Sequence, residues 1–301
     1  MINGLINVYK EPGFTSFDVV AVMRGVAGQR KIGHTGTLDP MAEGVLPVCL
    51  GNATKLCDML EDKKKEYVAT FMLGKRTDTL DITGEVLEEK EVTAKEEDII
   101  KAAESFVGGY YQLPPMYSAK WVDGRRLYDL ARSGVVVERN PVFVEIYELE
   151  VTKVSLPYVT IRVLCGKGTY IRSLCEDIAG KCNELAVMTG LVRTRVSDFK
   201  IEDALKISEL NAMKENGTLK DCVVPTDFAF TDLKKITVKK EFRKYIDNGN
   251  KVFFDQVEGE TDNLTNEEKV RVYNDEDRFT GLFSFCEEEN SFKPFKMFME
   301  L

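Results

Sequence analysis

Residues 33–55 carry the feature that most restricts how this chain can fold. The segment reads GHTGTLDPMAEGVLPVCLGNATK and contains the only histidine, His34, followed by an Asp39-Pro40 step. Four glycines stand in the segment, close to the apolar residues that begin at Val45. Glycine permits tight turns with unusual backbone angles, and loops of this kind often carry function. The segment therefore predicts a shaped functional loop beside a buried strand.

Alternation and capping signals elsewhere predict a mixture of strands and helices. We expect strands at residues 5–9, 67–73, 142–154 and 158–165. We expect helices capped by Ser16 and ended by Gly28, at residues 55–60, 127–132 and 170–182, and after the capping-box spacing of Thr93 and Glu96. Residues 75–84 read as a polar loop. From residue 236 onward the pattern changes to short strands at 251–254, 269–273, 281–285 and 294–299, separated by acidic turns. This change predicts a domain boundary near residue 231.

The net charge of −9 argues at first against a nucleic-acid partner. Residues 1–200, however, hold 26 Lys and Arg against 28 Asp and Glu, whereas residues 201–301 hold 15 against 22. The first two hundred residues are thus close to neutral, which leaves room for a local basic groove. Overall charge does not decide the partner.

The seven cysteines, at positions 49, 57, 165, 175, 182, 222 and 286, are scattered and never spaced as Cys-x-x-Cys. This pattern favours reduced thiols over a disulfide framework or a zinc cluster, and one histidine leaves little for metal ligation. No apolar run approaches the roughly 18 residues that span a membrane, and the first residues lack the pattern of a signal peptide. We expect a cytoplasmic protein without a metal and without membrane contact.

Each polar candidate also has an ordinary structural explanation when it is taken alone. Asp39 before Pro40 is typical of a helix N-cap with proline at the first helical position. Tyr67 on a strand is typical of a core residue. Arg172 falls in the first turn of a predicted helix, where the helix dipole disfavours a cation, which hints at a carboxylate partner elsewhere. Residues 166–169, Gly-Lys-Gly-Thr, precede a helix but lack the full spacing of a phosphate-binding loop.

Six blocks of sequence, taken together, add a more specific signal. They are NVYKEPGFTS (7–16), GHTGTLDP (33–40), KEYVATFMLG (65–74), RTDT (76–79), PMYSAK (115–120) and KGTYIR (167–172). In their order and spacing these blocks resemble the TruB family of tRNA pseudouridine synthases, over residues 2 to about 200. Thr37 stands where several members carry alanine. The tail from about residue 232 resembles, more loosely, the PUA-type RNA-binding domain of that family, although its turns are rich in acidic residues.

The resemblance implies an enzyme that isomerises the uridine at tRNA position 55, in the T-arm loop, to pseudouridine after flipping the base. Asp39 would be the nucleophile, attacking either ribose C1′ or uracil C6. Arg172 would hold Asp39 ionised, and Tyr67 would stack on the uracil and help to remove the C5 proton. Leu191 would form part of the pocket wall, and His34 would stack in the gap left by the flipped base. Lys10, Pro12 and Tyr170 would line or support the pocket. Contacts with the RNA backbone would come from Lys55, Lys64, Lys65, Arg76 and Lys120.

The fold implied by the resemblance is the α+β pseudouridine-synthase fold, with a mixed, largely antiparallel central sheet and a small, mostly-β, PUA-like C-terminal domain. The expected domains are a catalytic domain at residues 1–231, with a thumb-like segment at about 120–150, and a PUA-like domain at 232–301. We expect tRNA as the partner, a monomer, and no cofactor.

Two other functions remain open from the sequence. The chain could act mainly as a tRNA-binding folding helper whose catalysis is secondary. It could also be a hydrolase that uses Asp39 with Asp78 or Asp81, although that reading explains only one of the six blocks.

Overall fold

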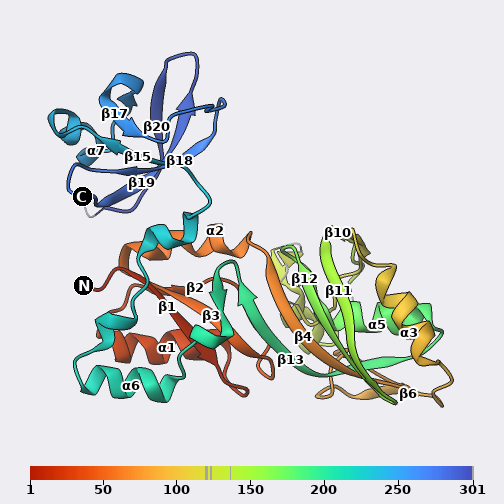
Figure 1. The fold of residues 1–301 in the computed structure, drawn as a ribbon. Helices are drawn as coiled ribbons and strands as arrows, with labels where there is room; N and C mark the ends of the chain where they lie inside the picture. The colour runs from red at the N-terminus through yellow and green to blue at the C-terminus, as the bar shows by residue number, and fades with distance from the viewer. Residues whose placement is uncertain (119–120, 123, 136, 300–301) are drawn as a thin grey trace.

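One eight-stranded sheet lies at the centre of the N-terminal part of the molecule (Figure 1). The computed structural model describes residues 1–118, 121–122, 124–135 and 137–299. The strand order is β1-β3-β13-β4-β12-β11, with β2 paired to β3 and β14 paired to β13. The strands are β1 Gly4–Lys10, β2 Ile32–His34, β3 Glu43–Leu50, β4 Lys65–Leu73, β11 Ile146–Ser155, β12 Tyr158–Cys165, β13 Ala186–Val196 and β14 Phe199–Lys200.

All pairings in this sheet are antiparallel except a short parallel contact between β3 and β13. At that contact Gly44 lies opposite Arg193, and its φ of +105° belongs to glycine. A Cβ on Gly44 would lie 2.3 Å from the Arg193 carbonyl oxygen, so only glycine permits the two strands to approach here. The predicted mixed, largely antiparallel sheet is confirmed.

Strand β4 runs through the middle of the sheet because its sequence alternates. Along Lys65–Leu73, buried residues alternate with partly buried ones, and Tyr67, Ala69 and Phe71 face the same core. Residues directly opposite across a ladder share a face, so β4 aligns its neighbours with Tyr67. Those neighbours are Val163 on β12 and Arg193 on β13.

The helices cover the two halves of the sheet separately (Figure 1). Helices α1 Ser16–Ala27 and α6 Ile207–Glu215 pack on the half that contains β1 and β3, and α3 Glu96–Glu104 and α5 Ile171–Lys181 pack on the half that contains β4, β12 and β11. The remaining helices are α2 Cys57–Glu61, α4 Leu127–Arg132 and α7 Arg243–Asp247. In the described residues every helix falls short of the length and apolar character needed to cross a lipid bilayer.

Two predicted helix starts are wrong, and side-chain hydrogen bonds explain both. The N-cap of α1 is Thr15, whose hydroxyl accepts the Asp18 N–H at 3.0 Å, while Gly28 ends the helix in the left-handed conformation as predicted. Thr93 does not cap α3, which begins at Glu96 after Lys95. Instead the Thr93 N–H and hydroxyl both donate to the buried carboxylate of Glu184, at 2.8 and 2.9 Å.

Three other segments depart from their predicted form. Residues 51–56 form a 3-10 turn, and helix α2 begins only at Cys57. The polar loop at 75–84 begins with strand β5 Lys75–Thr77, which pairs with β6 Val86–Glu89. The strand expected at 142–154 is split, because β10 Val142–Val144 pairs with β7 Tyr110–Gln112 whereas β11 pairs with β12. Two antiparallel strands of two residues each, β8 Trp121–Val122 and β9 Arg125–Arg126, precede α4.

The C-terminal residues form a second, mostly-β domain with a core of its own. Its six strands follow the order β16-β20-β19-β18-β15-β17. They are β15 Lys235–Val238, β16 Val252–Phe253, β17 Val257–Gly259, β18 Lys269–Tyr273, β19 Phe279–Cys286 and β20 Ser291–Met297. Leu282 and Phe298 of this domain share a buried cluster with Leu5 and Leu56, beside helix α2. The predicted mostly-β C-terminal domain is confirmed.

Candidate active site

Asp39 lies in a turn between β2 and β3, and this turn is held from several sides. The Ala42 N–H donates to the Asp39 carbonyl at 3.1 Å, and no helix follows, so the helix-cap explanation of the Asp-Pro step is wrong. The hydroxyl of Ser16 on α1 accepts the Leu38 N–H at 2.9 Å. Fixed on both sides, the turn presents the Asp39 side chain, which is 39% exposed.

Lys10 supports the same turn from beneath. Its side chain is fully buried, and its ammonium donates to the carbonyl oxygens of Pro40, at 3.0 Å, and Ala42. Burial lowers the pKa of Lys10 to about 8. Pro12 is exposed, and the N–H of the next residue, Gly13, donates to the Pro40 carbonyl. Lys10 thus supports the Asp39 turn, Pro12 lies next to a residue that does so, and neither Lys10 nor Pro12 lines the cavity.

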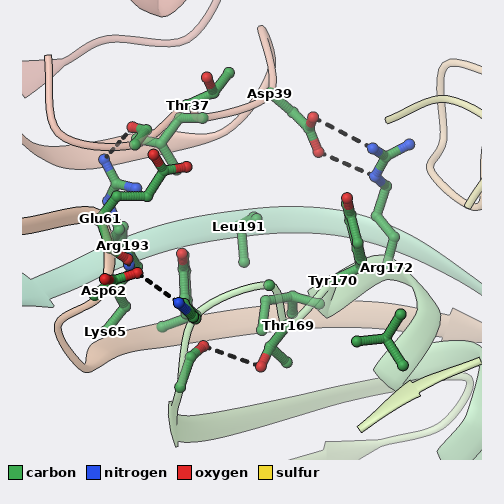
Figure 2. Close-up of a pocket in the computed structure, with 18 of the residues that line it drawn as sticks. Thr37, Asp39, Glu61, Asp62, Lys65, Thr169, Tyr170, Arg172, Leu191 and Arg193 are labelled. Atoms are coloured by element: carbon green, nitrogen blue, oxygen red, sulfur yellow. Dashed lines mark hydrogen bonds and ion pairs between the residues drawn. The ribbon is translucent and has the colours of Figure 1, made fainter. Parts of the chain in front are cut away.

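Arg172 comes from the first turn of α5 and meets Asp39 across 133 positions of sequence. Its guanidinium is only 6% exposed, and its Nε and one terminal nitrogen lie 3.0 and 3.3 Å from the two carboxylate oxygens (Figure 2). It also donates to the carbonyl oxygens of Thr79 and Tyr117, at 2.8 and 2.7 Å, and lies 3.7 Å from the Asp81 carboxylate. This paired geometry fixes the direction in which Asp39 points.

The charges around Asp39 oppose one another. Burial is the largest influence and raises the pKa of Asp39, the Arg172 guanidinium lowers it, and the Asp81 carboxylate raises it. A carboxylate with a raised pKa is poorly solvated when it is ionised, and such groups gather at functional sites.

A cavity of about 520 Å³ opens beside this pair. This volume lies within the usual range of ligand pockets, about 300–1,000 Å³. Figure 2 shows Asp39 and Arg172 at one end, Arg193 and Lys65 at the other, and Leu191 between them. The cavity is also lined by Thr37, Glu61, Asp62, Tyr67, Val142, Phe143, Tyr170 and the 166–169 loop.

Tyr67 enters the cavity from the centre of the sheet. Its side chain is 8% exposed, and burial raises the pKa of its phenol. Arg193 lies directly opposite Tyr67 in the β4–β13 ladder, and the positive charge of its guanidinium works against that rise. An aromatic face and an apolar leucine on one wall, with a carboxylate at the rim, suit a flat polar ring such as a nucleobase.

Two comparisons of the sequence relate this chain to known proteins. Residues 24–171 match the TruB family pseudouridylate synthase, N-terminal domain. The tRNA pseudouridine synthase B of Lachnoclostridium phytofermentans is 48% identical over 99% of this chain and 100% of its own length, and that of Clostridium tetani is 44% identical over 93% and 95%. The chain belongs to the TruB family of pseudouridylate synthases. Since the relatives are named as pseudouridine synthases, a chain that acts mainly as a folding helper, or one that acts as a hydrolase, is not favoured.

Chains in two solved complexes have a fold similar to that of this chain. A Cbf5-Nop10-Gar1 complex contains a chain that matches 98% of this one with a TM-score of 0.76 and 27% identity, over 85% of its own length. A chain of an H/ACA RNP bound to a substrate RNA matches 99% of this one, and 85% of itself, with a TM-score of 0.75 and 25% identity.

Five of the predicted site residues meet at the cavity of this TruB-family chain, and Lys65 lies at its far end. The five are Asp39, Tyr67, Arg172, Tyr170 and Leu191. Lys65 was expected on the RNA backbone, but its ammonium donates to the carbonyl oxygens of Glu61 and Lys63, at 2.6 and 3.0 Å.

His34 and the other basic candidates lie away from the cavity lining. His34 is in β2, edge-on to Phe17 with ring centres 5.3 Å apart, and burial lowers its pKa. Lys55 donates to the Met297 carbonyl at 2.8 Å, Lys64 lies 3.9 Å above the Tyr147 ring, and Arg76 pairs with Glu88 at 2.9 Å. Lys120 falls outside the described residues.

Three features of the site were not predicted from the sequence: Arg193, Asp81 as a second carboxylate beside Arg172, and Phe143 in the cavity lining. For Arg193 one signal was present: it follows Leu191 by two positions on a strand, so both residues share the cavity face. None of the described residues forms a group of three or more His, Cys, Asp or Glu side chains suited to a metal ion.

Proposed function

We propose that the protein is a tRNA pseudouridine synthase that isomerises the uridine at position 55, in the T-arm loop. The observation that carries the proposal is the paired Asp39 carboxylate at the rim of a cavity whose walls suit a nucleobase. The names of the TruB-family relatives support tRNA as the substrate class.

The reaction begins when the target base leaves the loop and enters the cavity. Bases in a single-stranded loop unstack at a cost of only a few kcal/mol, so the loop favours this step. Tyr67 stacks on the uracil, and Leu191 closes the apolar side. His34, held edge-on by Phe17, fills the space vacated in the RNA loop.

Asp39 then attacks as the nucleophile, at ribose C1′ or uracil C6. Arg172 keeps the carboxylate ionised and aimed, since it donates a hydrogen bond to one oxygen and forms an ion-pair contact with the other. The N-glycosidic bond breaks, the uracil turns within the cavity, and a bond forms from C5 to the same ribose carbon. The bond that Asp39 made, to C1′ or to C6, breaks again and returns the free carboxylate. Loss of the C5 proton, assisted by Tyr67, completes an isomerisation that needs no cofactor.

RNA binding is divided between the two parts of the chain. A catalytic domain at residues 1–231, with its thumb-like segment at about 120–150, holds the T-arm loop, and a PUA-like domain at 232–301 contacts the rest of the tRNA. The RNA backbone is contacted by four basic side chains, those of Lys55, Lys64, Arg76 and Lys120. The protein acts as a monomer.

The test is to incubate the protein with an unmodified tRNA transcript, with the isolated T-arm stem-loop, and with a transcript whose T-arm uridine 55 is replaced by cytidine. Pseudouridine is mapped by carbodiimide treatment and primer extension. We expect a single pseudouridine at position 55 in the first two RNAs and none in the third. Modification at another position, or none in any RNA, would reject the proposed substrate.

A further inference from the structure

Arg193 is a buried cation that no carboxylate of the described residues pairs with. Its side chain is 1% exposed, and among the residues that the structure describes it takes part in no ion pair. Its Nε donates to the Val45 carbonyl at 2.7 Å, and a terminal nitrogen donates to the Gly36 carbonyl at 3.2 Å. Burying an unpaired charge is costly, and two backbone carbonyls replace the lost hydration only in part. A well-packed apolar residue at this position would make the folded state more stable. The presence of a charged residue therefore indicates a function other than stability.

The neighbour of Arg193 in the cavity is Tyr67. The two residues lie directly opposite in the β4–β13 ladder, which places their Cβ atoms about 4.5–5.5 Å apart on one face. Both residues line the same cavity, so the buried guanidinium lies beside the phenol. A cation close to an ionisable group favours its negatively charged form. Arg193 therefore favours negative charge on the phenol oxygen of Tyr67.

Other groups around the phenol have the opposite effect. Cys165 on β12 and Asp39 in the turn raise the pKa of Tyr67, as burial does, while Arg193 on β13 lowers it. Lys65, which lies at the start of β4, has its own pKa lowered to about 8 by burial and by Arg193. Among the groups that face the phenol, Arg193 is thus the one whose charge favours the phenolate.

We propose that Arg193 is a positioning residue that enables Tyr67 to accept the C5 proton of the rearranged uracil. In this step the C5–H bond breaks and its electron pair forms the C5–C6 double bond. The pair that leaves C6 goes to N1 if Asp39 attacked C1′, and returns to the Asp39 carboxylate if Asp39 was bound at C6. N1, freed from the ribose, takes up a proton, and the C5 proton passes to the Tyr67 phenolate oxygen, which later releases it to water. The inference rests on the proposed pseudouridine synthase activity.

A fluorine at C5 separates this step from the earlier ones. Because fluorine cannot leave as a proton, an RNA with 5-fluorouridine at the target proceeds through bond cleavage and carbon–carbon bond formation and then stops. We would measure single-turnover rates on T-arm stem-loops carrying uridine, 5-deuterouridine or 5-fluorouridine, with wild type, Arg193→Met, Arg193→Lys and Tyr67→Phe. The matched control is Arg195→Met, on the same strand but 38% exposed and 3.7 Å from Glu66.

General-base catalysis contributes roughly 100- to 10,000-fold, so weakening the base should cost at least about tenfold. We expect Arg193→Met to slow the uridine substrate at least about tenfold more than the 5-fluorouridine substrate, and to raise the deuterium isotope effect. Tyr67→Phe should show the same contrast, Arg193→Lys should recover part of the rate, and Arg195→Met should match wild type.

Equal slowing of both RNAs by Arg193→Met, with an unchanged isotope effect, would overturn the inference and leave Arg193 a purely structural role. If Arg193→Met does not fold, as judged by circular dichroism, the same contrast is read from Arg193→Lys. A wild-type protein that forms no pseudouridine would instead reject the proposed function itself.

Discussion

Replacement of Arg172 by methionine removes the group that holds Asp39 in place. The guanidinium makes two contacts with the Asp39 carboxylate, at 3.0 and 3.3 Å, and is almost fully buried. A hydrogen bond to a charged group contributes about 1.5–3 kcal/mol, so the one at 3.3 Å, reinforced by the ion-pair contact at 3.0 Å, is worth about 3 kcal/mol at the upper value. If that stabilisation is realised at the attacking carboxylate, the single-turnover rate should fall roughly 100-fold.

The same replacement should change how the rate depends on pH. Arg172 is the main group that lowers the pKa of Asp39, against burial and the Asp81 carboxylate, which raise it; Lys10 also lowers it. Without Arg172 this pKa rises further, and a nucleophilic carboxylate must be ionised. The acidic limb of the rate profile should therefore move to higher pH in Arg172→Met, so that the variant loses more activity at about pH 6 than at about pH 8.

The control is Arg172→Lys, which keeps the positive charge but loses the planar fork. Its rate should fall because one ammonium cannot replace the two contacts with Asp39 and the two with the Thr79 and Tyr117 carbonyls, while its acidic limb should stay near that of wild type. The assay is the single-turnover rate of pseudouridine formation on the T-arm stem-loop between about pH 5.5 and 8.5. An Arg172→Met protein within about threefold of wild type at every pH would refute this reasoning.

Three further predictions concern separate parts of the chain. His34→Ala should weaken binding of the T-arm stem-loop by about 1–3 kcal/mol, the usual worth of base–aromatic stacking, and His34→Phe should restore it in filter binding; equal losses in both variants would exclude stacking. Burial lowers the pKa of Lys65 to about 8 from an unfolded value near 10.5, so the folded protein loses this proton at lower pH than the unfolded chain does. Between about pH 7 and 9.5 the unfolding free energy of wild type should therefore rise by roughly 2 kcal/mol relative to that of Lys65→Met, measured by urea unfolding. A difference between the two proteins that stays constant with pH would contradict this prediction. Glu184→Ala removes the buried acceptor of two Thr93 donors and should cost about 2–4 kcal/mol of stability in the same assay, with stem-loop affinity unchanged.

The central features of the site could be predicted because they are recorded in contiguous blocks of sequence. Three local patterns mark the site: the Asp39 turn, the alternation around Tyr67 and the start of α5. The family resemblance predicted that these three segments meet at one site. The Asp39–Arg172 pair and the shared cavity agree with that expectation.

Long-range partners account for what the sequence did not predict. Thr93 has the spacing of a helix cap, but a glutamate 91 positions away accepts its hydrogen bonds. Lys65 reads as a surface cation within a lysine run, yet the turn before β4 supplies two carbonyl oxygens that bind its ammonium. Arg193 reads as an ordinary strand residue, and its importance depends on lying opposite Tyr67 across the ladder.

The most direct test of the account is the activity of Asp39→Asn beside Asp58→Asn, a matched change on helix α2 outside the cavity lining. Both proteins and wild type would be incubated with the T-arm stem-loop under single-turnover conditions, with pseudouridine mapped and RNA affinity measured in parallel. The account predicts that Asp39→Asn binds the RNA as wild type does and forms no pseudouridine, while Asp58→Asn is fully active. Pseudouridine formed by Asp39→Asn at a rate near that of wild type would contradict the assignment of Asp39 as the nucleophile.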